Sequence, residues 1–304
     1  MEIFLTGGTG FIGSYVTERL LRNGHRLTIL ARNPQKIKGF VDHPQIRFIH
    51  GKLSDHEKIE ASMIGCEACI HIALGWGETA REMLLEDTLN SVFLFECAAR
   101  NGVAHFIYTS STAAIGEFIP RMDEKVNTMP SDYYGATKAA SENYLLAVSV
   151  KTGMRSIIIR PGYTFGNPVV SGAPMQPDSR FRDMVKKVLN DETIRLVEND
   201  GTQFIWAGDL ASLYESVLES SYNRQIYFGL GREFVTWEEI AKKVIESTGS
   251  SSKIITEDYG YRETPYLFDL RKIERDFGFS FTCREKIIEH IRYIQTLFTS
   301  SINA

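Results

Sequence analysis

The sequence predicts an α/β protein in which a Rossmann-type, doubly wound parallel sheet is followed by a smaller C-terminal α/β substrate lobe. Short apolar runs alternate with longer amphipathic stretches through the first half of the chain. Such alternation is typical of parallel strands joined by crossover helices. A glycine-rich turn directly after the first apolar run marks the first strand-to-helix connection. The 304 residues, 43% of them hydrophobic, are enough to bury the core of such a fold.

Six strand-like runs and four helical patterns can be assigned in chain order. Strands are expected at 3–5, 27–30, 46–49, 69–73, 106–108 and 156–159. Helices are expected at 11–23, 55–64, 80–101 and 133–152, where apolar residues recur three and four positions apart. Asn23-Gly24 and Asn101-Gly102 supply residues that accept the positive φ of a helix end, so they set two of these boundaries.

The composition changes after residue 162. Pro, Gly and Ser are frequent between Asn167 and Asp178, which is typical of an exposed loop, and shorter mixed elements follow. We therefore expect a dinucleotide-binding Rossmann domain at 1–162 and a smaller substrate-binding lobe at 163–304, with segments near 203–228 able to return to the first domain. The short tail beyond Phe298 is expected to fray.

Charge and composition exclude several classes of function. The formal net charge is −4, which gives no electrostatic reason to expect a nucleic acid or an anionic membrane as a partner. No apolar run approaches the roughly eighteen residues of a membrane span, and no basic segment with a cleavage site precedes the first strand, so we expect a cytoplasmic protein. The four cysteines are too few for a disulfide scaffold, and the seven histidines lack metal-ligand spacing, so no metal is expected.

The glycine-rich segment Thr6-Gly7-Gly8-Thr9-Gly10-Phe11-Ile12-Gly13 indicates dinucleotide binding. Gly7 suits a tight turn, Gly10 a close approach of the backbone to a pyrophosphate, and Gly13 close packing of helix against strand. The following helix N-terminus offers free N–H groups and a partial positive charge to the phosphates.

The end of the second strand selects between the two nicotinamide dinucleotides. An acidic residue about 18 positions after Gly13 would bind the ribose hydroxyls of NAD, but Ala31 and Arg32 stand there. Because an arginine pairs well with a 2′-phosphate, the sequence favours NADP and leaves NAD open.

Five further segments follow the glycine turn in a fixed order. They are Tyr108-Thr109-Ser110-Ser111-Thr112, Tyr134-Gly135-Ala136-Thr137-Lys138, Arg160-Pro161-Gly162-Tyr163-Thr164-Phe165-Gly166, Ile205-Trp206-Ala207-Gly208-Asp209-Leu210-Ala211, and Asp269-Leu270-Arg271-Lys272 with Phe277-Gly278-Phe279. With the glycine turn, this set resembles the extended short-chain dehydrogenases/reductases, the NAD(P)-dependent epimerase/dehydratase family, over nearly the whole chain.

The resemblance implies an enzyme that transfers a hydride between nicotinamide C4 and a secondary alcohol or ketone. Tyr134 would be the general acid/base, and Lys138, on the same helix face, would favour the phenolate and bind the nicotinamide ribose. Ser111 would hold and polarise the substrate oxygen. The cofactor-binding residues expected with this set are Gly7, Gly10, Phe11, Ile12, Gly13, Arg32, Lys52, Leu53, Ala73, Tyr134, Lys138 and Pro161.

Three departures from the family pattern bear on these expectations. Lys52 stands where the family has an Asp that contacts adenine, and an ammonium cannot act as an acceptor. Asp87 stands where an Asn usually opens the next helix, so a carboxylate replaces a cofactor-facing amide. Ser111 is not followed by the Asp-Glu pair of the sugar-nucleotide 4,6-dehydratases, which disfavours dehydration.

The substrate pocket is expected beside Trp76, Thr112 and Tyr163. The leading hypothesis is an NAD(P)-dependent oxidoreductase or epimerase of a small substrate, with a sugar nucleotide as the favoured class. Two alternatives stay open: an NADPH-dependent carbonyl reductase resembling the dihydroflavonol reductases, and a catalytically silent NADP-binding sensor. The helices near 80–101 and 133–152 carry a second apolar face that matches the family's four-helix dimer, which predicts a homodimer.

Overall fold

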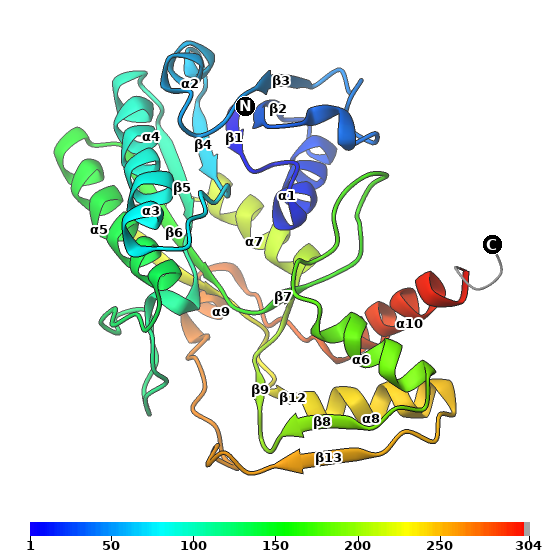
Figure 1. Ribbon diagram of the computed structural model, residues 1–304. Helices are drawn as coiled ribbons and strands as arrows, with labels where there is room; N and C mark the ends of the chain where they lie inside the picture. Colours follow the sequence, from blue (N-terminus) through cyan, green and yellow to red (C-terminus); the bar gives the residue numbers. More distant parts are fainter. Residues whose placement is uncertain (301–304) are drawn as a thin grey trace.

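The computed structural model of the protein describes residues 1–300 and has a seven-stranded parallel sheet at its centre (Figure 1). The strand order is β11-β6-β5-β4-β1-β2-β3, and each neighbouring pair runs parallel. The chain starts in the sheet interior, moves outward to one edge through β2 and β3, and then reaches the other side through β4, β5 and β6. This order confirms the predicted doubly wound, Rossmann-type sheet.

Six strands of this sheet match the six predicted ones closely, whereas the strand at 225–229 and the helix at 207–219 were not assigned from the sequence. The strands are β1 (Glu2–Thr6), β2 (Arg26–Ala31), β3 (Ile46–His50), β4 (Ala68–His71), β5 (His105–Thr109), β6 (Arg155–Pro161) and β11 (Gln225–Gly229). The helices are α1 (Phe11–Arg22), α2 (His56–Met63), α3 (Ala80–Met83), α4 (Leu89–Arg100), α5 (Tyr133–Thr152) and α7 (Ala207–Glu219), with short 3-10 turns η1 (Pro34–Lys36) and η3 (Thr112–Ala114).

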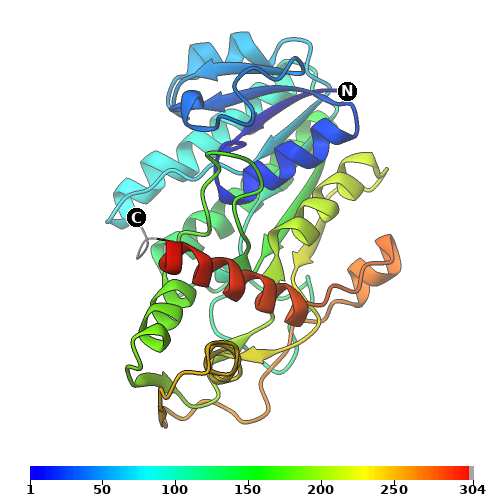
Figure 2. The same cartoon turned by 90° about the vertical axis from the view of Figure 1, so that its right-hand side faces the viewer.

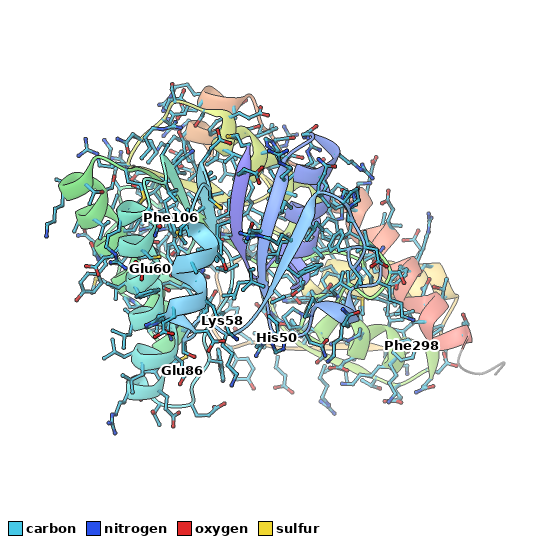
Figure 3. The ribbon with its side chains drawn as sticks, turned by 90° about the horizontal axis from the view of Figure 1, so that it is seen from above. His50, Lys58, Glu60, Glu86, Phe106 and Phe298 are labelled. Atoms are coloured by element: carbon cyan, nitrogen blue, oxygen red, sulfur yellow. The ribbon has the colours of Figure 1, made fainter. Side chains whose placement is uncertain are left out.

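Two layers of helices bury the two faces of the sheet. Ile3 and Leu5 of β1 pack in the core beneath α1 and α7, whereas Phe4 packs with Phe106 beneath α2, α4 and α5. Neighbouring residues of a strand point to opposite faces, so both faces need apolar side chains and the strands appear as continuous apolar runs. Seen from above, the strands stand between the two layers, and Phe106 lies beside the α4 layer (Figure 3).

The helix predicted at 80–101 is continuous, but its winding changes in the middle. α3 leads into a π-helical turn at Leu84–Thr88 (η2), and α4 follows directly. The side-chain amide of Asn90 donates to the carbonyls of Leu85 at 3.1 Å and Glu86 at 2.8 Å, which supports the wider turn. Such turns are frequent at functional sites, and the spacing of apolar residues does not reveal them.

A smaller lobe follows β6. Its elements are β7 (Thr164–Phe165), α6 (Arg180–Leu189), β8 (Ile194–Val197), β9 (Gly201–Thr202), β10 (Ile205–Trp206), β12 (Val235–Thr236), α8 (Trp237–Thr248), β13 (Ile254–Glu257), α9 (Arg271–Phe277) and α10 (Arg284–Ser300). α6, α8 and α10 share a core around the rings of Phe181, Phe204 and Trp237, and α10 crosses the front of the lobe in Figure 2. Residues 301–304, the end of the tail expected to fray, lie outside the described residues.

The chain returns from this lobe to the sheet. α7 packs against α1 in the same core, and β11 pairs with β6, with Gln225 opposite Ile157. The sheet is therefore built from two separate stretches of chain. A division of cofactor and substrate binding between residues 1–162 and 163–304 stays a prediction. None of the helices within residues 1–300 has both the length and the apolar character to cross a bilayer.

Candidate active site

One large cleft opens at the carboxyl ends of the central strands. It has a volume of about 890 Å³ and is lined by residues that follow β1 through β6. In doubly wound sheets, ligands bind at this edge, where the strand order reverses. Most of the predicted site residues line it: Gly7, Gly10, Phe11, Ile12, Gly13, Arg32, Lys52, Leu53, Ala73, Trp76, Ser111, Tyr134, Lys138 and Pro161.

The turn between β1 and α1 leaves no room for side chains. Gly7 has a φ of 74°, and a Cβ on it would lie 2.5 Å from the backbone nitrogen of Ala73. A Cβ on Gly13 would lie 1.9 Å from the carbonyl oxygen of Gly7. The first turn of α1 can therefore rest directly on the end of β1, with its N-terminus at the cleft. A helix N-terminus in this position is suited to the phosphates of a dinucleotide.

A buried histidine joins the ends of β1 and β4 beneath this turn. Nδ1 of His71 lies 2.6 Å from Oγ1 of Thr6, and Nε2 lies 3.0 Å from Oγ of Ser91 on α4. Burial lowers the pKa of His71 to about 3, and the charge of Lys138 adds to the effect. His71 is therefore neutral at pH 7 and serves as a hydrogen-bonded core residue that holds the floor of the cleft.

α5 presents Tyr134 and Lys138 to the cleft one turn apart. The carboxylate of Asp132 caps the helix by accepting the backbone N–H of Gly135 at 2.6 Å. Nζ of Lys138 lies 5.7 Å from the centre of the Tyr134 ring and 5.2 Å from that of Tyr108. Burial opposes the charge of Lys138, but Tyr108, Asp87 and Tyr134 outweigh burial and raise its pKa above the ordinary value. Lys138 is thus a buried cation at neutral pH.

Ser111 reaches the cleft from the end of β5. It caps η3, where its Oγ accepts the backbone N–H of Ala113 at 3.1 Å. A Cβ on Gly135 would lie 2.3 Å from the carbonyl oxygen of Ala113, so η3 and the start of α5 are in close contact. This packing brings Ser111 and Tyr134 to the same cleft although they are separated in sequence.

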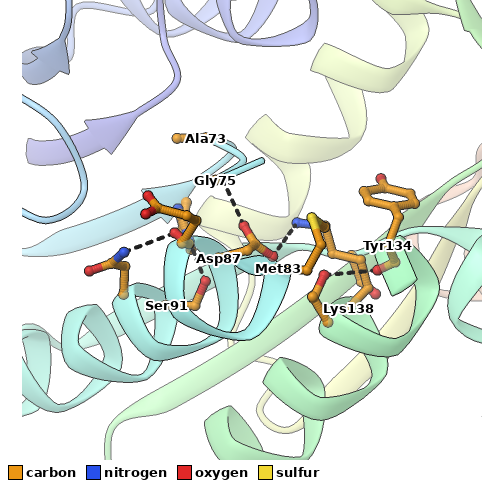
Figure 4. Close-up of polar contacts among 12 residues, drawn as sticks. Ala73, Gly75, Met83, Asp87, Ser91, Tyr134 and Lys138 are labelled. Carbon is orange, nitrogen blue, oxygen red and sulfur yellow. Dashed lines mark hydrogen bonds and ion pairs between the residues drawn. The ribbon is translucent and has the colours of Figure 1, made fainter. Parts of the chain in front are cut away.

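Asp87 lies beside Lys138, as Figure 4 shows. Its Oδ1 accepts the backbone N–H of Gly75 at 3.0 Å, and its Oδ2 lies 3.6 Å from Nζ of Lys138. The sequence identified Asp87 as a departure from the family pattern but placed it toward the cofactor. Its lysine partner was missed, because the π-helical turn that carries Asp87 leaves no signal in the apolar periodicity.

A second buried charge pair lies behind the cleft. Glu142, one turn beyond Lys138 on α5, binds Arg160 of β6 and also accepts a hydrogen bond from Ser110. The sequence pointed to Arg160 only as part of a family segment, and it gave no signal for Glu142. Pairing of two residues on different elements is a tertiary property that spacing along one helix does not show.

The far end of the cleft is basic. Arg32 follows β2 and Lys52 follows β3, and both line the cleft with Ser54. The backbone N–H of Lys52 donates to the carboxylate of Asp55 at 2.9 Å, which orders the loop after β3. Among the described residues that line the cleft, the one carboxylate is that of Glu86, which belongs to η2 rather than to this end.

The three predicted substrate residues do not all meet at the cleft. Trp76 lines it and is 61% exposed. Thr112 begins η3 next to the cleft but is not among its lining residues. Tyr163 is not among them either, because its ring packs in the lobe, 4.9 Å from the ring of Phe204 and 5.4 Å from that of Trp237.

Comparison with known protein families agrees with this geometry. The description of the NAD-dependent epimerase/dehydratase family matches residues 3–228, about three quarters of the chain. The chain belongs to the NAD-dependent epimerase/dehydratase family. The epimerase/dehydratase described here is therefore an NAD(P)-dependent enzyme of the oxidoreductase type, as the resemblance predicted.

Relatives of this family member act on different substrates. A 3 beta-hydroxysteroid dehydrogenase/Delta 5→4-isomerase of Mycobacterium tuberculosis is 26% identical over 264 residues, which cover 82% of this chain and 70% of the relative. A dTDP-glucose 4,6-dehydratase of Streptomyces niveus is 24% identical, covering 92% and 88%. The solved structure of a UDP-glucuronic acid 4-epimerase from Bacillus cereus with NAD superimposes with a TM-score of 0.81 at 19% identity, covering 98% and 100%, and shows the same fold.

Proposed function

We propose that this epimerase/dehydratase family member is an NADP(H)-dependent oxidoreductase. It transfers a hydride at a secondary alcohol or ketone of a small substrate and uses Ser111, Tyr134 and Lys138 as its catalytic residues. The observation that carries the proposal is that these three side chains line one cleft together with the glycine turn. A tyrosine and a lysine four apart on an ordinary surface helix would have neither the serine nor the glycine turn beside them.

The residues of the cleft fit a nicotinamide dinucleotide. The backbone at Gly7 and Gly13 is so close-packed that a side chain would collide with it, and this leaves the N-terminus of α1 open to a pyrophosphate. Ala73 and Pro161 would flank the other half of the cofactor near Tyr134. A bound nicotinamide supplies the hydride chemistry, while the protein positions and polarises the substrate.

Tyr134 moves the hydroxyl proton of the substrate. Its phenol gives this proton to the carbonyl oxygen during reduction, and its phenolate removes it during oxidation. The ammonium of Lys138 is buried 5.7 Å from the centre of the ring, where it stabilises the negative charge that develops on the phenol oxygen as the proton moves. The hydroxyl of Ser111 donates a hydrogen bond to the substrate oxygen and draws electron density from the reacting carbon.

Two cations support NADP over NAD. Arg32 and Lys52 line the end of the cleft that lies beyond the glycine turn, after β2 and β3. A 2′-phosphate in this position would gain charge-assisted hydrogen bonds from the guanidinium and the ammonium. No carboxylate of the described lining residues lies there to bind the two free ribose hydroxyls of NAD.

A sugar nucleotide is the favoured substrate class. A solved structure with the same fold, that of the Bacillus cereus epimerase, contains UDP-glucuronic acid. Thr112 and the two alanines after it supply no carboxylate beside Ser111, which supports oxidation, reduction or epimerisation over dehydration. Trp76, at the mouth of the cleft, offers an indole ring for stacking on a planar group.

A carbonyl reductase is the second candidate. Arg32 favours it, and a putative dihydroflavonol 4-reductase of Synechocystis is 28% identical over 171 residues, which cover 54% of this chain. The cofactor released by denatured protein separates the two. Tightly retained NAD(H) indicates an epimerase that recycles its cofactor, whereas an empty protein that binds NADPH more tightly than NADH indicates a reductase.

We also infer a homodimer formed through α4 and α5. Leu89 of α4 is 52% exposed, and Tyr144 and Val150 of α5 are 53% and 64% exposed. The two helices lie side by side, and no other element of residues 1–300 covers their outer surface (Figure 1). Exposed apolar side chains on neighbouring helices are typical of a protein interface.

The decisive experiment replaces the acid/base residue and nothing else. Tyr134→Phe should lose at least 100-fold in turnover, roughly the contribution of a general acid, measured as oxidation of NADPH by dihydroflavonols and as reduction of NADP⁺ by a panel of UDP-sugars. Binding of NADPH, followed by its fluorescence, should survive. Tyr133→Phe, on the exposed neighbouring tyrosine, is the matched control and should keep full turnover. Undiminished turnover in Tyr134→Phe would show that the acid/base assignment is wrong, and cofactor binding with no turnover by the wild-type protein would favour the sensor.

A further inference from the structure

We infer that Asp87 is a positioning residue for Lys138. Its buried carboxylate is the counter-ion of the Lys138 ammonium and keeps Tyr134 in the protonated, proton-donating form to a higher pH than an unpaired ammonium would allow. The inference rests on the proposed function, because it concerns the same tyrosine and lysine. It adds a residue that the catalytic set of serine, tyrosine and lysine does not contain.

The carboxylate of Asp87 is held in place from two sides. Its Oδ1 accepts the backbone N–H of Gly75 at 3.0 Å, and its Oδ2 points to Nζ of Lys138 at 3.6 Å (Figure 4). The side chains of Asp87 and Lys138 are 0% and 3% exposed, so water does not screen the pair. A Cβ on Gly75 would lie 2.0 Å from the carbonyl oxygen of Glu86, which shows how closely the loop rests on η2.

Among residues 1–300, the cation that pairs with Oδ2 of Asp87 is the ammonium of Lys138. This oxygen has no hydrogen-bond partner within residues 1–300, although it is fully buried. A buried carboxylate oxygen without a partner is costly unless a cation lies near it, and Lys138 supplies that cation. The orientation of the carboxylate is therefore explained by the ion pair rather than by packing alone.

Among the described groups around Lys138, Asp87 supplies the carboxylate that pairs with its ammonium. Lys138 is faced by Asp87 from η2, Tyr108 from β5, His71 from β4, Tyr214 from α7 and Tyr134 on its own helix. Burial raises the pKa of Tyr108 to about 12 and lowers that of His71 to about 3, so both are neutral at pH 7. Glu142, the next carboxylate along α5, is already paired with Arg160.

The ion pair changes the electrostatic potential at the phenol oxygen of Tyr134. A buried ammonium near the ring and without a counter-ion would favour the phenolate. A carboxylate 3.6 Å from that ammonium cancels much of its field, so the phenol keeps its proton to higher pH. Reduction of a carbonyl requires the protonated phenol, and the pair therefore extends to higher pH the range in which Tyr134 can donate its proton.

Tyrosine labelled with ¹³C at Cζ provides a direct test, because its NMR signal reports the ionisation of each phenol. The signal of Tyr134 is assigned as the one absent from Tyr134→Phe. In Asp87→Asn, which keeps the shape and loses the charge, the pH midpoint of this signal should be about one unit lower than in the wild type, the smaller end of the effect of a nearby charge. Asp87→Glu should restore a midpoint near that of the wild type. Asp123→Asn removes a carboxylate from the loop before α5 and should leave the midpoint unchanged.

An unchanged or higher midpoint in Asp87→Asn would overturn the inference, as would the absence of any Tyr134 titration below pH 11 in that variant. Asp87→Ser removes the same charge with a smaller side chain and should give the same shift, so the test stands if one variant fails to fold. The measurement needs neither substrate nor turnover. If Tyr134→Phe retains activity, the proposed function is wrong, but the titration of Tyr134 still tests the inference. If the wild-type enzyme is active and the midpoint of Tyr134 does not change in Asp87→Asn, only the inference is wrong.

Discussion

Glu142 and Arg160 form a buried ion pair that joins α5 to β6 behind the cleft. Nε of the guanidinium donates to Oε1 at 2.8 Å, and Nη2 donates to Oε2 at 2.7 Å. The two side chains are 4% and 2% exposed. Two parallel hydrogen bonds to one carboxylate fix the relative orientation of the groups as well as neutralise them. The pair therefore fixes α5 one turn beyond Lys138, which sets where the catalytic residues lie.

Removing one partner of this pair should be strongly destabilising. Glu142→Gln leaves the guanidinium buried without a counter-ion, and we expect a loss of about 3–5 kcal/mol in the free energy of unfolding, measured with urea. Glu142→Leu combined with Arg160→Met should recover much of the loss, because no charge is then left unpaired. Glu60→Gln, which breaks an ion pair with Arg100 whose side chains are about half exposed, should cost less than about 1 kcal/mol. Equal losses from Glu142→Gln and Glu60→Gln would contradict this account.

Cofactor preference should depend on the basic end of the cleft. Arg32→Ala is expected to weaken NADPH binding by roughly 10- to 100-fold, the value of a lost charge-assisted hydrogen bond, and to leave NADH binding nearly unchanged. Lys52→Ala should have a smaller effect in the same direction. Arg100→Ala, on an exposed ion pair of α4, is the control and should alter neither affinity. Equal affinities of the wild type for NADH and NADPH would remove the basis of the NADP assignment.

The buried His71 should make the fold sensitive to acid. Its pKa is about 3 in the folded protein against an ordinary value of about 6.5, because burial disfavours its charge. Between these values the unfolded chain binds the proton and the folded chain does not, so stability is complete above about pH 6.5 and is lost as the pH falls toward 3. The slope for this one group approaches 1.4 kcal/mol per pH unit.

The acid sensitivity can be assigned to His71 by substitution. His71→Asn should reduce the fall in urea midpoint between pH 6.5 and pH 4, whereas His50→Asn, at the exposed last residue of β3, should not. Burial also lowers the pKa of His105 and of His290 to about 4, so these two histidines account for part of the remaining fall. His50 lies at the edge of the sheet, where its carbonyl accepts a hydrogen bond from Lys58 of α2 at 3.2 Å (Figure 3). An identical pH slope in His71→Asn and the wild type would refute the assignment.

The proposed dimer places Tyr144 in an interface. Tyr144→Glu introduces a charge on the outer face of α5 and should shift the mass measured by light scattering at micromolar concentration from dimer to monomer. Tyr259→Glu, on a 67% exposed tyrosine of the lobe, should leave the mass unchanged. A monomeric wild type under the same conditions would exclude the dimer.

The sheet and its helices could be predicted because their signals are local. β1 to β6 each contain a short apolar run, and α1, α2 and α5 repeat their apolar residues at helical spacing, so their ends fall within two residues of the predicted ones. The glycine turn could be assigned to its place because Gly7 and Gly13 are required there by close backbone contacts. In each case, the physical cause acts within a short stretch of chain.

The features that could not be predicted from the sequence depend on contacts between distant segments of the chain. The π-helical turn at η2 is supported by the amide of Asn90 and is invisible in the apolar periodicity. Tyr163 belongs to a family segment that suggested the substrate pocket, yet its ring packs in the aromatic core of the lobe. The ion-pair partners of Asp87 and Glu142 could not be predicted from the sequence either, because an ion pair between two elements depends on how those elements pack.

The position of β11 has a consequence for how the protein is made. β6, which contains Ile157, Ile158 and Ile159, forms one edge of the sheet until β11 has been synthesised and pairs with it. At roughly 5–20 residues per second, the chain from Pro161 to Gly229 takes several seconds to emerge. During that time, the nascent sheet presents an edge strand with three consecutive isoleucines and unpaired backbone groups, which is a template for pairing with another chain. The length of chain between β6 and β11 thus sets how long this edge of the nascent sheet stays unpaired.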